Sequence, residues 1–90
     1  MRIDRFLFFI RLAKSRTIAQ HVIDEGHVRI DGKRVEKPSE EVRAGTIVAL
    51  PLHGQVRILP VLVLPVRRGP ASEARACYEE LTQGNPRPSE

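Results

Sequence analysis

Apolar side chains recur at helical spacing at the start of the chain. Four of them lie at positions i, i+3, i+4 and i+7: Ile3, Phe6, Leu7 and Ile10. This spacing predicts an amphipathic helix that begins near Asp4 and turns one apolar face to a core. Arg5 and Arg11 would then point away from that face.

A second helix is predicted after Ser15, whose hydroxyl can accept a hydrogen bond from a free backbone N–H in the first helical turn. Its buried face is expected to consist of Ile18, Ala19, Val22 and Ile23. Gly26 follows at the point where a positive φ allows the chain to leave a helix. The two helices would therefore be joined by a short connection that ends at Ser15.

The pattern then changes to that of strands. Residues 27–30 alternate polar and apolar side chains, and Asp31-Gly32 is a strong signal for a two-residue hairpin. Residues 46–50 form a β-branched run that we expect Pro51 to end. Residues 56–64 are mostly apolar but contain Pro60, which favours an edge strand or a bulge. A small sheet is expected.

A further helix is predicted near the end of the chain, because Pro70 suits a first helical position. Later apolar residues recur at helical spacing: Ala74, Cys77, Tyr78 and Leu81. We expect residues 1–66 to form one domain with its sheet extension, residues 67–83 to form a helix packed on it, and residues 84–90 to be a flexible tail. The predicted class is α+β: two N-terminal helices on a small, mostly antiparallel sheet, plus a C-terminal helix.

Composition narrows the class of protein. Ninety residues, 41% of them hydrophobic, correspond to one small domain with a modest core. The single cysteine, Cys77, excludes an intramolecular disulfide and is expected to be a packing residue in a cytoplasmic protein. The apolar run at residues 6–10 is too short for a signal peptide or a membrane span. No spacing of Cys and His resembles a metal site, and no cofactor is predicted.

Charge is distributed unevenly along the chain, whose formal net charge is +4. Residues 1–16 hold five cations and one carboxylate, whereas residues 70–90 hold two cations and four carboxylates. Lys14 and Arg16 flank Ser15, so cations and free backbone amides would meet at one helix start, as a phosphate ligand requires. An ordinary solvated face remains the alternative interpretation of these charges.

Many spaced positions together resemble the S4 (αL) RNA-binding domain, first known from small-subunit ribosomal protein four. The residues that carry the resemblance are Arg2-Ile3-Asp4, Lys14-Ser15-Arg16-Thr17, Ala19, Ile23, Gly26, Val28, Ile30, Asp31-Gly32 and Lys37-Pro38. The resemblance covers about residues 2–50 and implies an αL fold that binds structured RNA. Gly45-Thr46 stands where the family usually has Gly-Asp.

The segments Arg67–Ala74 and Tyr78–Glu80 resemble the part that follows this domain in the bacterial heat-shock protein 15 group. That group is ribosome-associated. It is linked, like similar short proteins of bacterial ribosome quality control, with large subunits that carry a stalled nascent chain and tRNA. The resemblance implies a comparable role here, although this chain lacks the long basic tail of some members.

The resemblance also implies which residues face RNA. The predicted set is Arg2, Arg5, Arg11, Lys14, Ser15, Arg16, Thr17, His21, Arg29, Lys33 and Arg34. Such residues would grip phosphates and recognise shape rather than base sequence. About five phosphate contacts imply a slope near −3.5 in a plot of log affinity against log salt. Charge reversal at Lys14 and Arg16 is expected to weaken binding without unfolding the domain.

Other interpretations stay open at this point. The protein could be a general binder of ribosomal RNA or tRNA, or an adaptor whose acidic C-terminal segment binds a protein. An enzyme is not expected, because S4 domains also occur beside catalytic domains but no catalytic domain fits between Met1 and Glu90. We expect a monomer that binds RNA and the large ribosomal subunit and no membrane.

A few side chains have two interpretations each. Of Phe8 and Phe9, one could stack on an unpaired base, but packing against the C-terminal helix, with Tyr78 as a partner, is favoured. Arg67-Arg68 could extend the RNA surface or solvate a loop. Surface polar roles are expected for all three histidines: His21, His27 and His53.

Overall fold

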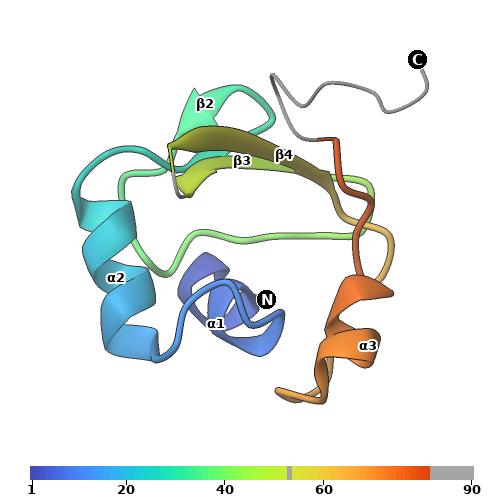
Figure 1. Cartoon of the computed structure of the whole chain (residues 1–90). Helices are drawn as coiled ribbons and strands as arrows, with labels where there is room; N and C mark the ends of the chain where they lie inside the picture. Colours follow the sequence, from blue (N-terminus) through green and yellow to red (C-terminus); the bar gives the residue numbers. More distant parts are fainter. Residues whose placement is uncertain (53, 82–90) are drawn as a thin grey trace.

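The computed structural model describes residues 1–52 and 54–81. Two helices, α1 (Ile3–Phe9) and α2 (Arg16–Asp24), come first, and a short helix, α3 (Ala71–Arg75), follows the sheet. Figure 1 shows all three helices on the same side of the sheet. The predicted α+β class, with two N-terminal helices packed on an antiparallel sheet and a C-terminal helix, is confirmed.

The sheet has four strands in the order β2-β1-β3-β4, and all neighbours are antiparallel. The strands are β1 (Arg29–Ile30), β2 (Lys33–Arg34), β3 (Ile47–Leu52) and β4 (Gln55–Pro60). Long β3 and β4 pair along their whole length, whereas β1 and β2 contribute two residues each. The sheet is therefore a β3–β4 ribbon extended by one short hairpin (Figure 1).

The β1–β2 hairpin turns at Asp31-Gly32, as the sequence predicts. Ile30 pairs with Lys33, and the two turn residues have φ angles of 51° and 84°. Two successive positive φ angles match the twist of the flanking strands, which explains the preference for Asp-Gly at this place. The strand itself is shorter than the expected 27–30 and begins at Arg29.

The core lies between the helices and the inner face of the sheet. Val48 and Leu50 of β3 and Leu59 of β4 are buried there. They face the predicted stripe of α1, which is buried throughout: Ile3, Phe6, Leu7 and Ile10. In α2, Ala19 and Ile23 are buried and Val22 is half-buried, but Ile18 is 46% exposed, so its assignment to the buried face is wrong. The face of α2 that is buried is therefore narrower than the face on which its apolar residues lie.

Pro51 does not end its strand, contrary to the sequence-based expectation. It lies within β3 and pairs with Val56. On its other side, β1 pairs only with Val48 and Ala49, so no strand needs an N–H donor from position 51. Pro60 is the last residue of β4, the outermost strand, which agrees with the predicted edge.

The C-terminal helix is shorter than the predicted 67–83, and the expected helical stripe through Leu81 is wrong. After α3 the chain becomes extended and runs beside β4. Tyr78 forms a bridge with Val61, and the N–H groups of Glu79 and Leu81 donate to Pro60 O and Ile58 O at 2.9 and 2.8 Å. The open edge of β4 supplies acceptors that a helix would leave unused. The expected helix end at 82–83 and the tail at 84–90 lie outside the described residues.

Candidate RNA-binding surface

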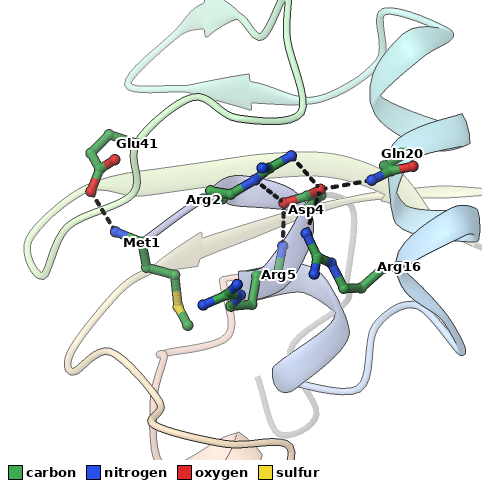
Figure 2. Close-up of polar contacts among 7 residues, drawn as sticks. All are labelled: Met1, Arg2, Asp4, Arg5, Arg16, Gln20 and Glu41. Atoms are coloured by element: carbon green, nitrogen blue, oxygen red, sulfur yellow. Dashed lines mark hydrogen bonds and ion pairs between the residues drawn. The ribbon is translucent and has the colours of Figure 1, made fainter.

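A buried carboxylate organises the start of α1. The side chain of Asp4 is fully buried, and Figure 2 shows polar groups from α1, α2 and the preceding residue directed at it. Arg2 donates from Nε to Oδ1 and from Nη2 to Oδ2, both at 3.1 Å. Gln20 donates to Oδ2 at 2.9 Å, and Arg16 reaches the same oxygen at 3.4 Å. Two cations thus share one carboxylate.

The backbone around Arg2 is also fixed. Ile3 donates its N–H to Glu40 O at 2.8 Å, and Val42 donates to Met1 O at 2.7 Å. The N-terminal ammonium group forms an ion pair with Glu41 at 2.6 Å (Figure 2). Arg2 is therefore held by its main chain on one side and by its guanidinium group on the other.

These contacts also set the protonation of Asp4. Burial alone would raise its pKa, but hydrogen bonds from Gln20, Arg2 and the backbone N–H of Arg5 outweigh burial and lower the pKa below its ordinary value of 3.8. The carboxylate is consequently charged at neutral pH. With both arginines, the cluster carries a net charge of +1.

The two arginines remain accessible despite their contacts. The side chains of Arg2 and Arg16 are 44% and 39% exposed, while Asp4 between them is at 0%. Arg16 Nε is buried and has no hydrogen-bond partner among the described residues, so the polar contacts of Arg16 are incomplete. Reversal of the charge of Arg16 would place a second carboxylate beside buried Asp4. The expectation that such a change leaves folding intact therefore conflicts with this geometry.

Four predicted cations are exposed and make no side-chain ion pair or hydrogen bond within residues 1–52 and 54–81: Arg5, Lys14, Lys33 and Arg34. Arg5 follows Asp4 on α1 and appears beside the cluster in Figure 2. Lys14 precedes the cap of α2. Their charges are available to an external anion without the loss of an internal contact.

The start of α2 has the predicted cap. Ser15 has an extended backbone, and its hydroxyl accepts a hydrogen bond from the N–H of Ile18 at 3.1 Å. The cap lies between Lys14 and Arg16, and exposed Thr17 follows. A helix start with cations on both sides attracts negative charge.

The remaining predicted residues of α2 and the hairpin contact the protein itself. His21 lies 3.0 Å from Glu25, one helical turn later. Arg29 donates to Gly32 O across the hairpin at 3.4 Å. The side chain of Arg34 lies over Gly26, 3.4 Å from the position that a Cβ atom would occupy. Gly26 has the predicted positive φ, 83°, a conformation that favours glycine, and a Cβ atom there would be in ordinary van der Waals contact with Arg34.

Arg11 belongs to a different neighbourhood. It has a φ of 68° after α1 and donates from Nη1 to Gly69 O at 2.8 Å. Arg68 donates from Nε to Phe8 O at 3.0 Å, and its guanidinium carbon lies 4.7 Å from the centre of the Phe8 ring. These contacts tie the end of α1 to the segment before α3.

Arg67 also contacts the protein, since it pairs with Glu73 at 3.0 Å. The two interpretations of Arg67-Arg68, as RNA surface or as solvated loop, did not include the contacts of Arg67 with Glu73 and of Arg68 with Phe8. Phe9 lines a pocket together with Ala74 and Cys77, which supports packing against the α3 segment rather than base stacking.

Cys77 is a packing residue, as expected. It is buried, and burial followed by the nearby Glu73 charge raises the pKa of its thiol. Within the described residues, no group of three or more His, Cys, Asp or Glu side chains could hold a metal ion. In the same part of the chain, no helix has the length and apolarity needed to cross a membrane. His53 lies outside the described residues.

Sequence reasoning missed the two residues that organise the surface, Asp4 and Gln20. A sequence pattern was available for Asp4 alone: it is the one carboxylate among the charges of residues 1–16, and it adjoins the apolar stripe at Ile3. An acid at the edge of a buried stripe needs donors nearby, and the neighbouring arginines could supply them.

Comparison with known proteins agrees with this architecture. The sequence model of the S4 domain family matches residues 1–48. Heat shock protein 15 of Escherichia coli K12 is 34% identical over 92% of this chain and 62% of its own length. Small ribosomal subunit protein uS4 of Lacticaseibacillus casei is 45% identical over 54% of this chain and 24% of its own length. The chain thus spans less than two thirds of these relatives.

A solved structure is also similar. Heat shock protein 15 of Vibrio cholerae superposes with a TM-score of 0.84 and 28% identity, covering 90% of this chain and 81% of that one. That structure is described as trimeric, whereas our expectation of a monomer stays a prediction. The matched family consists of non-enzymatic RNA-binding domains, as predicted. The chain belongs to the S4 domain family.

Proposed function

We propose that this chain binds structured RNA of the large ribosomal subunit through its α1–α2 basic surface, defined as Arg2, Arg5, Lys14 and Arg16. The observation that carries the proposal is the convergence of Arg2 and Arg16 on buried Asp4. Exposed Arg5 and Lys14 and the capped start of α2 lie next to them in sequence. Because the chain belongs to the S4 domain family of RNA-binding proteins, we propose RNA as the ligand of this cationic surface.

The chemistry of the surface favours phosphate contacts over base recognition. Guanidinium groups and helix-start amides bind phosphate oxygens, which carry no sequence information. The side chains that make up the surface include no aromatic ring on which a base could stack. We therefore expect the protein to recognise RNA by shape, with affinity that falls as salt rises.

We also propose a role in the rescue or quality control of large subunits that carry a stalled nascent chain. Support comes from the similarity to heat shock protein 15, which extends beyond the S4 domain to 92% of this chain. The resemblance of residues 67–80 to the same group points the same way. The protein would act in the cytoplasm, where its targets are.

The binding unit is proposed to be a single chain, because one copy supplies all four residues of the surface, from α1, α2 and the residues directly before them. The trimeric relative makes this a point to measure. Light scattering of the free protein and of its RNA complex distinguishes a 10.2 kDa monomer from a species three times heavier.

Co-sedimentation with purified large subunits, empty or carrying peptidyl-tRNA, tests the function. Arg5→Glu is compared with Arg75→Glu, a matched control of identical charge change in α3. Both arginines are exposed, and neither has an ion-pair partner within the described residues. Circular dichroism checks that both variants are folded.

Binding that is stronger to the occupied subunit and lost in Arg5→Glu alone would support the whole proposal. Equal binding to both subunit states would remove the rescue role and leave a general ribosomal RNA binder. Equal loss in both variants would show that total charge, not this surface, governs binding. No binding to either subunit would overturn the proposal and favour a protein-binding adaptor.

A further inference from the structure

Asp4 poses a problem for an RNA-binding surface, because it places a negative charge among the cations that would meet phosphate. By simple Coulomb reasoning the surface would bind RNA more tightly without it. Yet the side chain is fully buried and accepts hydrogen bonds from Arg2, Gln20 and the backbone of Arg5. Burial of a charge is costly, so its contacts have to offset a substantial desolvation term.

We infer that Asp4 is a positioning residue that holds Arg2 and Arg16 in place for one RNA phosphate or two adjacent ones. This inference rests on the proposed function. Arg2 donates from Nε and Nη2 to the two carboxylate oxygens, and its Nη1 donates to no group within the described residues. Arg16 donates to the described residues from Nη2 alone, while its Nε is buried. Each arginine therefore retains donors while its side chain is restrained.

This restraint lowers the entropy cost of RNA binding. A free arginine side chain on a surface populates many rotamers, and an RNA ligand must fix it at a cost in entropy. Here the protein fixes two arginines before the ligand arrives, using an acceptor that lies beneath them rather than beside them. Because Asp4 is at 0% exposure and the arginines are at 44% and 39%, a phosphate meets the cations first.

Gln20 completes the arrangement from α2. Its amide donates to Oδ2 at 2.9 Å, the oxygen that Arg2 and Arg16 share. A neutral donor holds the carboxylate without adding a third cation that would compete for it. Residues of α1 and α2 are thus joined through one carboxylate, and the spacing of the two arginines depends on it (Figure 2).

Asp4→Asn tests the inference with the full chain, using isolated large-subunit ribosomal RNA as the probe in fluorescence anisotropy. Two opposite results are possible. If positioning dominates, the variant binds about tenfold more weakly, because two arginines must be ordered on binding. The slope of log affinity against log salt also becomes shallower, by the amount expected for the loss of about one phosphate contact. If charge dominates, the variant binds as tightly as the wild type or more tightly, and the inference is overturned.

A second pair of variants keeps the test decisive if Asp4→Asn does not fold. Arg2→Lys preserves charge but loses the two-point contact with Asp4, since an ammonium group cannot match both oxygens in the same fork. Arg5→Lys is the control, because the Arg5 side chain has no ion pair or hydrogen bond to lose within the described residues. Weaker binding in Arg2→Lys than in Arg5→Lys supports positioning, and equal effects overturn it.

Two further measurements separate this inference from the proposed function. Wild-type binding and its loss in Arg5→Glu judge the function alone. The NMR signal of Arg2 Nε–H judges the restraint without RNA: protection from solvent exchange in the wild type and its loss in Asp4→Asn are expected. An unprotected signal in the wild type would sink the positioning role even if RNA binds.

Discussion

The chain uses arginines in two different ways, around Asp4 and around α3. Near Asp4, Arg2 and Arg16 share one buried acceptor and remain substantially exposed. Near α3, Arg11 and Arg68 donate to backbone carbonyls 58 and 60 residues away in sequence. The first arrangement presents cations to the outside, whereas the second joins distant segments of the fold.

This difference shows that a count of cations does not locate an RNA surface. Arg11 was predicted as an RNA contact on the same grounds as Arg2, namely the resemblance to the S4 domain, and both are cations near the N-terminus. Its carbonyl partner, Gly69, gives it a role in the fold that the sequence does not reveal. The two regions differ less in charge than in two other properties. These are the number of N–H donors that remain for an external ligand and the groups that restrain each arginine side chain.

The largest expected effect is the loss of the Asp4 carboxylate. Asp4→Ala should lower the free energy of unfolding by about 3 kcal/mol, because it leaves several donors without their buried acceptor. Glu73→Ala, which breaks the exposed pair with Arg67, should cost less than about 1 kcal/mol. Urea denaturation measures both. Similar losses in the two variants would contradict the contrast between the regions.

Arg68→Ala is expected to have the next largest effect, on stability alone. It removes the hydrogen bond to Phe8 O and the contact with the Phe8 ring, at a cost of about 2 kcal/mol. The affinity of the folded variant for RNA should stay within about twofold of the wild type, because no surface donor is lost. Denaturation and anisotropy on one preparation check both parts. A large loss of affinity in a folded protein would place Arg68 on the RNA surface.

Local patterns predicted most of the helices and the hairpin, because their causes lie within a few residues. The stripe from Ile3 to Ile10 and the Asp31-Gly32 turn need no distant partner. The end of α3 could not be predicted in this way. Residues 78–81 have helical spacing, but the β4 edge, about 20 residues earlier, binds them in an extended form.

The candidate surface was predictable in composition but not in organisation. Charge and capping identified Lys14 and Arg16 as neighbours of a helix start, the family resemblance added Arg2 and Arg5, and the cap at Ser15 is confirmed. The contact of Arg16 and Gln20 with Asp4 depends on how α2 crosses α1, which periodicity does not specify. Sequence therefore supplied the candidate residues but did not predict the hydrogen bonds that link Arg2, Arg16 and Gln20 through Asp4.

Substitutions of Ser15 distinguish its effect on helix stability from its effect on RNA binding, and both expected effects are smaller than those above. Ser15→Ala should lower the free energy of unfolding by about 1 kcal/mol through loss of the cap. Ser15→Asp should retain most stability, since Asp also caps a helix, yet weaken RNA binding by adding a negative charge between Lys14 and Arg16. Denaturation and anisotropy on both variants test the pair. Undiminished affinity of Ser15→Asp would remove the α2 start from the surface.

The smallest expected effect is a pH dependence at the Asp4 cluster. Because the pKa of Asp4 is lowered in the folded protein, its stabilising contribution is complete above the unfolded value, near 3.8, and is lost as pH falls through the lower folded value. Wild type should therefore lose its advantage over Asp4→Asn only in this acid range. Urea denaturation of both proteins from about pH 7 to about pH 2.5 measures the difference. Glu41 also has a lowered pKa, from its contact with the N-terminal ammonium, but it is present in both proteins and cancels. A constant difference across this range would mean that the carboxylate is not held by Arg2 and Gln20 in solution, and the contrast with the α3 region would lose its physical basis.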